Sequence, residues 1–350
     1  MPTLHTSAFS AIHSKKMGSY NGSKWGMPVT LLKTLKGSYY NFNFHYKDNG
    51  NTIIIGPQGT GKTTLTHFLL AQSLKFDVNI IYIDLESRSN HFINAINGKI
   101  IELFEDQEAP IQIDLLDITN YDGDTDWMAD LLLKICAKDD LYRYHNKSYI
   151  AKFKELANQL ASMKNFDEKM KYMESLIGQF DDLTIKTNYK NFFKSKFFNK
   201  FFQKNILNAL SEHQYLSIDF SNIFSNTQLS NPFLGLLLAR IPECLTGKKT
   251  IIVVNHARSI FDAYAFKNQV SQWLAKLTEN NAMVLLSQLY LSDRMIGKDF
   301  KHSFSLSNQE FNYIKSYDKG KRRFLIKHGD DSIFAGMNLS GLEDLLDYLG

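Results

Sequence analysis

The residues with the clearest chemistry form a glycine-rich loop early in the chain. The segment Gly56-Pro57-Gln58-Gly59-Thr60-Gly61-Lys62-Thr63 fits the Walker A spacing GxxxxGKT, and Thr64 follows it. Glycines let the backbone turn tightly so that its N–H groups point inward, and the positive end of a following helix adds to the attraction for an anion. The loop therefore predicts a site for the phosphates of a nucleotide.

Three side chains of this loop have separate predicted roles. Lys62 reaches the β and γ phosphates of ATP or ADP, Thr63 supplies a hydroxyl ligand for Mg²⁺, and Thr64 donates near the α phosphate. An apolar strand at 52–55 precedes the loop and an amphipathic helix at 62–75 follows it. This strand, loop and helix context is the one that phosphate binding requires.

The elements around the loop alternate between strands and helices, which predicts an α/β fold with a mostly parallel sheet covered on both faces. The predicted strands and helices are, in chain order, strand 52–55, helix 62–75, strand 78–83, helix 90–96, strand 99–103, strand 215–220, helix 232–241, strand 250–254, helix 263–278 and strand 282–286.

The two ends of the chain have a different pattern. Residues 1–28 are polar and interrupted by glycines, which predicts an extended arm, and 29–36 with 38–46 predict a hairpin that turns at Lys36-Gly37. Near the other end we expect a strand pair at 311–316 and 323–328, followed by a short helix that ends at Gly350.

The middle of the chain, 121–211, lacks a strand signal and predicts an all-helical insertion. The predicted domains are therefore 1–48 for the arm and hairpin, 49–120 with 212–350 for the nucleotide-binding domain, and 121–211 for the insertion. Six lysines and no acid lie among the phenylalanines of 183–211. Such a segment is a structural helix, a partner or peripheral membrane contact, or a DNA contact, and its phenylalanine spacing favours the structural role.

Composition excludes several classes of protein. The chain has 350 residues, 44% of them hydrophobic and 22% charged, which is typical of a folded domain with a substantial core. A formal charge of +4 is too mild to indicate a polyanionic partner for the whole molecule. Cys136 and Cys244 have no ligand-like neighbourhood, and no apolar run reaches the roughly 20 residues of a membrane helix. The cysteine usage fits a reducing cytoplasm.

Four segments together resemble the C-terminal ATPase domain of the type IV secretion and conjugation ATPases, the CagE/TrbE/VirB group related to TraC. They are 24–46, which contains Trp25-Gly26; the glycine-rich loop; 84–98; and 322–341, which reads RRFLIKHGDDSIFAGMNLSG. The resemblance covers nearly the whole chain. Because family members carry a large domain before the Trp-Gly segment, it also implies that this chain corresponds to a C-terminal portion.

The resemblance implies a RecA-like P-loop NTPase that binds ATP or ADP with Mg²⁺. It further implies a homo-hexamer, or a hetero-hexamer shared with an active paralogue. We therefore expect a cytoplasmic location peripheral to the inner membrane, beside other type IV secretion subunits.

One departure from the family pattern bears on hydrolysis. Where the family places the Asp-Glu pair of its Walker B motif, this sequence has Asn255-His256. Asparagine keeps an oxygen ligand for the Mg²⁺ shell but loses the negative charge. Loss of a positioned base typically costs about 10² to 10⁴ in rate. The motif is therefore degenerate, and we expect weak or absent hydrolysis.

Other candidate catalytic residues keep an active enzyme open as an alternative. Asp84 or Glu86, after the strand at 78–83, could supply the missing carboxylate, or could simply cap the next turn. By resemblance, Gln288 senses the γ phosphate and Arg322-Arg323 are retained.

The hypotheses about function are thus ranked. The first is an ATP-binding subunit of a type IV secretion system with weak or absent hydrolysis. The second is an active ATPase motor that uses Glu86 or Asp84. The third is a DNA translocase of the coupling-protein type, but no basic pore loop supports direct nucleic-acid binding.

Overall fold

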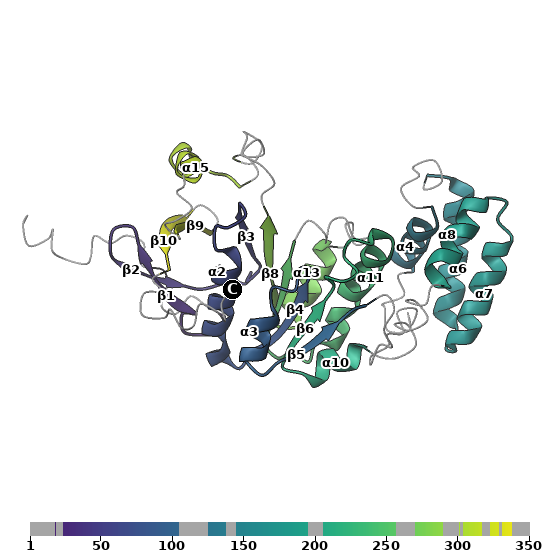
Figure 1. Ribbon diagram of the computed structural model, residues 1–350, viewed down its shortest axis with the longest axis horizontal. Coiled ribbons are helices and arrows are strands. Elements are labelled where there is room, and N and C mark those ends of the chain that lie inside the picture. The colour runs from purple at the N-terminus through teal and green to yellow at the C-terminus, as the bar shows by residue number, and fades with distance from the viewer. Residues whose placement is uncertain are drawn as a thin grey trace, which may run out of the picture. The chain divides into compact units, whose positions relative to one another are not determined.

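A computed structural model describes residues 18, 24–104, 125–137, 145–194, 206–256, 270–289, 301, 304–316, 323–328 and 331–337. The chain divides into two compact units, one formed by 1–78 with 283–350 and the other by 79–282 (Figure 1). Most of the predicted arm and the whole predicted C-terminal helix lie outside the described residues.

The first unit contains two kinds of strand pairing. Its described elements are β1 (Thr30–Thr34), β2 (Tyr39–Phe42), β3 (Thr52–Gly56), α2 (Lys62–Ser73), η2 (Leu74–Phe76), β8 (Ala282–Leu289), α15 (Asn308–Lys315), β9 (Arg323–His328) and β10 (Asp331–Gly336). Strands β3 and β8 run parallel. The other four form an antiparallel sheet in the order β2-β1-β10-β9. The predicted hairpin is confirmed, and Gly37 turns it with a φ of 82° that favours glycine.

An aromatic cluster joins the hairpin to the helix that follows the glycine-rich loop. The ring of Trp25 lies 6.4 Å from that of Phe44 and 5.7 Å from that of Phe76, which ends η2. Lys75 Nζ donates hydrogen bonds of 2.7 and 2.8 Å to the carbonyl oxygens of Pro28 and Val29. The Trp-Gly segment is therefore packed against the C-terminal end of the α2 and η2 pair.

The predicted strand at 311–316 is wrong, because these residues belong to helix α15 or follow it directly. Ser307 and Glu310 form a reciprocal capping box at the helix start: Ser307 Oγ accepts from the Glu310 N–H and Glu310 accepts from the Ser307 N–H. A capping box of this kind marks the start of a helix. The partner of β9 is instead β10, in antiparallel register.

The second unit is built on a parallel sheet. Its described elements are β4 (Asn79–Asp84), α3 (Asn90–Ala95), β5 (Lys99–Glu102), α4 (Asp126–Ala137), α6 (Lys147–Ser162), α7 (Phe166–Gly178), α8 (Leu183–Phe193), α10 (Ile206–Glu212), β6 (Tyr215–Asp219), α11 (Thr227–Arg240), η3 (Ile241–Cys244), β7 (Thr250–Asn255) and α13 (Val270–Glu279). Strands β7, β4, β6 and β5 pair in that order, all parallel. Every residue of β7 is buried, as are all but the first of β4 and β6, because helices cover both faces of such a sheet.

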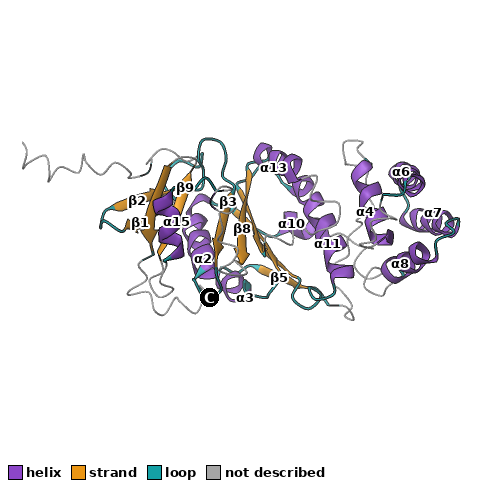
Figure 2. Ribbon diagram, turned by 90° about the horizontal axis from the view of Figure 1, so that it is seen from above, coloured by secondary structure: helices purple, strands orange, loops and turns teal. Residues whose placement is uncertain are grey.

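The described helices between 126 and 193 confirm the helical character of the insertion (Figure 2). Side chains of Asn146, Asn165 and Asp182 cap the N-termini of α6, α7 and α8. Phe192 and Phe193 are buried at the end of α8, with their rings 4.9 Å apart. These two phenylalanines thus have the predicted structural role, whereas the rest of the lysine and phenylalanine segment, 195–205, lies outside the described residues.

Helix α11 begins earlier than predicted. The predicted helix covers 232–241, but the helix begins at Thr227 and Pro232 lies inside it. The Ser230 N–H donates to the Asn226 carbonyl oxygen at 2.9 Å and Ser230 is 2% exposed, so a buried first turn forms ahead of Pro232. Of the predicted helix at 263–278, residues 270–278 belong to α13 and 263–269 lie outside the described residues.

Candidate functional site

The glycine-rich loop joins β3 to α2 in the first unit, as predicted. Gly59 and Gly61 have φ values of 76° and 81°, a backbone region that other residues rarely adopt. Gly61 is the N-cap of α2, no side chain caps the helix, and its first turn carries no acid. The N–H groups at this helix start are therefore suited to donate hydrogen bonds to a phosphate, which is the predicted ligand.

Two side chains of the loop fold back on its own backbone. Lys62 Nζ donates to the Pro57 carbonyl oxygen at 2.9 Å, and Thr60 Oγ1 donates to the same oxygen at 2.8 Å. These bonds keep the Lys62 ammonium on the loop and so add a positive charge to the cradle of N–H groups.

The other predicted site residues of the first unit are placed less completely. In the β3 and β8 pairing Gln288 lies opposite Ile55, the residue before Gly56, so its backbone lies beside the start of the loop. Arg323 is exposed at the start of β9. The Gln288 side chain and Arg322 lie outside the described residues.

In the second unit Asp84 and Asn255 form a buried pair at the carboxyl ends of β4 and β7. Asn255 Nδ2 donates to Asp84 Oδ1 at 2.5 Å, and Asn255 Oδ1 accepts from the Leu85 N–H at 2.7 Å. The Asp84 carboxylate also accepts from the backbone N–H groups of Glu86 and Ser89, at 3.0 and 2.6 Å. Asp84 is 0% exposed and Asn255 6%. Asp84 therefore caps the turn after its strand, which is one of the two roles that the sequence predicted for it.

Glu86 and His256 meet beside this pair. His256 Nε2 lies 2.6 Å from Glu86 Oε1, and Arg88 forms an ion pair with the other carboxylate oxygen. The Glu86 side chain is 29% exposed and the His256 side chain 23%, so solvent reaches the pair. The carboxylate that could replace a Walker B glutamate is thus engaged on both of its oxygens.

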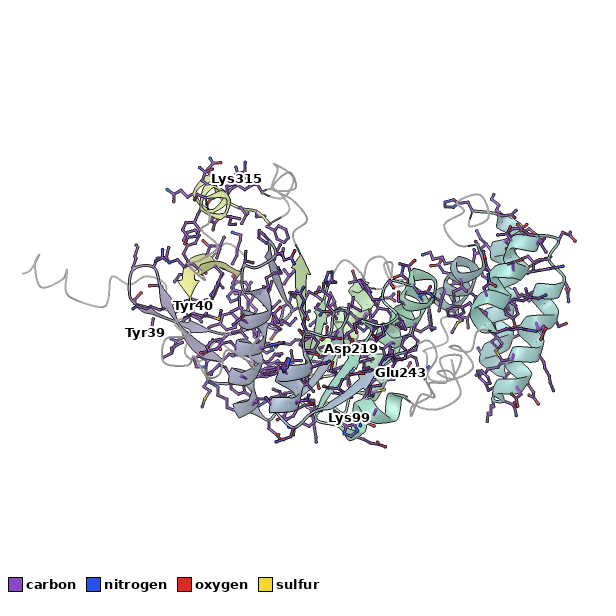
Figure 3. The ribbon with its side chains drawn as sticks, in the orientation of Figure 1. Tyr39, Tyr40, Lys99, Asp219, Glu243 and Lys315 are labelled. Atoms are coloured by element: carbon purple, nitrogen blue, oxygen red, sulfur yellow. The ribbon has the colours of Figure 1, made fainter. Side chains whose placement is uncertain are left out.

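Asp219 is a site residue that the sequence analysis missed. It ends β6 directly beside Asp84 in the sheet register, is 1% exposed, and is labelled in Figure 3. Its carboxylate accepts from Ser87 Oγ at 2.6 Å and from the Ser221 N–H at 2.8 Å. The signal was available, because β4 and β6 both end in Ile-Asp and the carboxyl ends of parallel strands meet at one edge of a sheet.

We define the strand-end cluster as Asp84, Glu86, Asp219, Asn255 and His256. Each of these side chains has a hydrogen-bond or ion-pair partner in the structure. The described residues contain no group of three or more histidine, cysteine or acidic side chains arranged to hold a metal ion. Buried carboxylates satisfied by several N–H and O–H donors stabilise the turns at a strand edge. The arrangement therefore supports structure more directly than proton transfer.

The structure has a Walker A loop between a parallel strand and a helix, and a parallel sheet covered by helices. These features define an α/β fold of the RecA-like P-loop NTPase class, as the sequence predicted. Residues 52–124 match the family of ATPases associated with various cellular activities (AAA). The solved structure of VirB4 of Thermoanaerobacter pseudethanolicus superposes with a TM-score of 0.68 at 12% identity, over 89% of this chain and 96% of that one.

Curated relatives point to one family. The chain is 26% identical to the type IV secretion system protein virB4 of Bartonella quintana, over 96% of this chain and 46% of that protein. It is 21% identical to the type IV secretion system protein PtlC of Bordetella pertussis, over 97% of this chain and 46% of that protein. The chain thus spans about half the length of the curated relatives it matches. These similarities are to VirB4 and PtlC proteins of type IV secretion systems, in agreement with the resemblance that the sequence motifs predict.

No helix among the described residues combines the length and the apolar character needed to cross a membrane.

Proposed function

We propose that this chain is an ATP-binding subunit of a type IV secretion system with weak or absent hydrolysis. The observation that supports nucleotide binding is the loop at the start of α2, whose uncapped N–H groups and Lys62 ammonium suit phosphates. Thr63 would hold Mg²⁺, which supplies positive charge against the β and γ phosphates. Gln288 is the proposed sensor of the γ phosphate, and Arg322 and Arg323 remain candidate catalytic residues.

The strand-end cluster supports the weak hydrolysis. Asn255 stands in place of a carboxylate. Its amide nitrogen donates to Asp84 and its amide oxygen accepts from the Leu85 N–H. Glu86 is engaged by His256 on one carboxylate oxygen and by Arg88 on the other, so an attacking water would have to displace one of these contacts to reach it.

The solvent access of the Glu86 and His256 pair favours one alternative, an active motor. A carboxylate that orients an imidazole is a known arrangement for general base catalysis. In this alternative His256 takes the proton and Glu86 holds the ring in position.

For the assembly, we propose a cytoplasmic subunit that is peripheral to the inner membrane and contacts other secretion subunits. The assembly we propose is a homo-hexamer or a hetero-hexamer with an active paralogue, and the hetero-hexamer would explain how a weakly hydrolysing subunit functions. We retain the domain division of 1–48, 49–120 with 212–350, and 121–211 as part of this proposal.

The test measures binding and turnover on one preparation. Calorimetry with ATP and ADP plus Mg²⁺ should show binding by the wild type and its loss in Lys62→Ala, whereas Lys171→Ala, an exposed lysine of α7, should bind normally. Phosphate release should stay near background. A rate of roughly 1 to 10³ per second would instead support the motor, and loss of that rate in Glu86→Gln would assign it to the Glu86 and His256 pair.

A further inference from the structure

The four-stranded sheet of the first unit has one face that is covered over only part of its width. Paired residues of neighbouring strands point to the same side of a sheet. Lys33 of β1 pairs with Gly336 of β10 and with Tyr39 of β2, so the three residues share one face. Alternation along β10 adds Phe334 and Ser332 to that face. Helix α15 lies on it at β9 and β10, where the Tyr313 ring is 4.0 Å from the Phe334 ring.

The part of this face over β1 and β2 is exposed and apolar. We call it the hairpin face and define it as Leu31, Lys33 and Tyr39 of the two strands together with Leu35 and Lys36, which are exposed in the turn that follows β1. Leu31 is 58% exposed, Leu35 41% and Tyr39 61%. Single exposed leucines are ordinary on a protein surface, but three large apolar side chains on one continuous face indicate a contact surface. Tyr39 and the neighbouring Tyr40 are labelled in Figure 3.

The charged residues of the segment that forms the hairpin face are all basic. Lys33 is exposed on the strand part of the hairpin face and Lys36 in the turn beside it. Lys24 and Lys47 are exposed nearby in the sequence, and 24–47 contains no acidic residue. On β10, Asp331 has the parity of buried Ala335 and so belongs to the opposite face. A surface of this kind is complementary to a partner that is both apolar and acidic.

Helix α15 shows how an acidic, amphipathic helix is seated on this sheet. Glu310 is 7% exposed, and its carboxylate meets Lys327 Nζ at 3.8 Å and a hydrogen bond from Ser332. Burial alone would raise the pKa of Glu310, but the hydrogen bonds from Ser332 and Ser307 and the charge of Lys327 hold it below its usual value. The helix therefore matches a carboxylate to a sheet lysine and an aromatic ring to a sheet aromatic.

The hairpin face repeats these two chemical features without a helix from the described residues on top of it. Lys33 corresponds to Lys327 as an outward lysine of the sheet, and Leu31 with Tyr39 corresponds to the apolar contact at Phe334. Sheet faces are normally covered by a packed layer, and a second helix lying beside α15 would complete that layer.

We propose that the hairpin face is a docking surface for an acidic, amphipathic helix of a partner protein. Glutamate or aspartate side chains of that helix pair with Lys33 and Lys36, and its apolar stripe packs on Leu31, Leu35 and Tyr39. This inference is independent of nucleotide binding and of the rate of hydrolysis.

The probe is a fluorescently labelled synthetic helix of about 18 residues, long enough to be helical in water, with leucines on one face and glutamate and alanine elsewhere. Two control peptides carry lysine in place of glutamate, or the same composition with the leucines scattered around the helix. Binding to the 350-residue chain is followed by fluorescence polarisation. We expect the acidic amphipathic peptide to bind, and both controls to bind at least about tenfold more weakly.

Variants of the chain locate the binding. Lys33→Glu with Lys36→Glu should weaken it about tenfold or more, and Leu31→Ser with Tyr39→Ser should do the same. The matched controls are Lys164→Glu with Lys171→Glu, two exposed lysines of the insertion, and Leu183→Ser, a leucine that is 75% exposed. These controls should bind like the wild type, and all variants should fold because every changed side chain is exposed.

The inference is overturned if the three peptides bind equally or not at all, or if the hairpin variants bind like the wild type. It is also overturned if Leu31→Ser with Tyr39→Ser abolishes binding to vesicles of phosphatidylglycerol and phosphatidylcholine while the acidic peptide fails to bind, since the surface would then be a lipid contact. Self-association of the chain that is lost in the same variant would overturn it in favour of a second copy.

Discussion

The phosphate loop is built from consecutive residues, 56–63, whereas the strand-end cluster takes its side chains from β4, β6, β7 and the turns that follow them, up to 171 positions apart. The loop keeps its shape through glycine conformations and two bonds to one carbonyl oxygen. The cluster keeps its shape through hydrogen bonds between buried side chains and distant backbone. We therefore expect substitutions in the loop to affect ligand binding, and substitutions in the cluster to affect stability.

The largest effect on stability is expected at Asp84. Asp84→Ala removes a buried carboxylate that accepts three hydrogen bonds and leaves the donors of Glu86, Ser89 and Asn255 without it. The free energy of unfolding should fall by roughly 3 to 5 kcal/mol in a urea titration. The control Glu155→Ala, at an exposed position of α6, should change it by less than about 0.5 kcal/mol. An equal effect of both changes would remove the distinction between the two regions.

The second prediction concerns the pairing of Asp84 with Asn255. Asn255→Asp brings a second carboxylate within hydrogen-bond distance of Asp84 at a buried position. Either one of the two carboxylates then binds a proton, or the two negative charges repel each other. We expect a loss of about 2 kcal/mol or more. Adding Asp84→Asn restores one amide and one carboxylate in reversed order.

The double variant should recover about 1 to 3 kcal/mol relative to the sum of the single changes, as measured by a double-mutant cycle in urea. Strictly additive losses would show that the hydrogen bond between the two side chains does not hold the sheet edge together. The double variant also returns a carboxylate to the end of β7, so its rate of phosphate release tests the proposed cause of weak hydrolysis.

A smaller effect, dependent on pH, is expected in the core of the first unit. Burial lowers the pKa of His45 to about 4, with the Lys24 charge acting in the same direction and Asp48 opposing it. Between about pH 6.5 and 4 the unfolded chain therefore binds a proton here that the folded chain does not. Stability from this group is complete above that range and is lost as the pH falls.

His45→Gln should flatten the fall in unfolding free energy between pH 7 and 4.5, measured by denaturant titration at each pH. The control is His91→Gln, a change at an exposed histidine of α3. A His45→Gln profile that matches the wild type would show that folding does not change the pKa of His45.

The smallest effect on stability is expected in the phosphate loop. Lys62→Ala removes one hydrogen bond to the Pro57 carbonyl from a half-buried side chain, so the free energy of unfolding should change by about 1 kcal/mol or less. Thermal unfolding without nucleotide measures this change. A loss comparable to that of Asp84→Ala would mean that the loop, like the cluster, is a structural element.

Much of the fold could be predicted from local patterns. Apolar runs at β4, β6 and β7 are short and continuous because both faces of a parallel sheet are buried, and such runs identify buried strands in any sequence. The errors concern one element type and one helix start. At α15 the sequence predicts a strand over 311–316, but the capping box of Ser307 and Glu310 starts a helix. At α11 it predicts a helix from Pro232, but the helix begins at Thr227.

By itself the sequence determined the phosphate loop, because the glycines, the lysine and the threonine that form it are consecutive and the backbone between two known elements has few ways to turn. It also showed that Asn255 and His256 stand where related ATPases have carboxylates. Only the tertiary structure decided what those two residues contact: Asn255 binds Asp84, His256 meets Glu86, and Asp219 joins them from a third strand. Strand order and register bring these residues to one edge, and both depend on contacts between segments that are far apart in the chain.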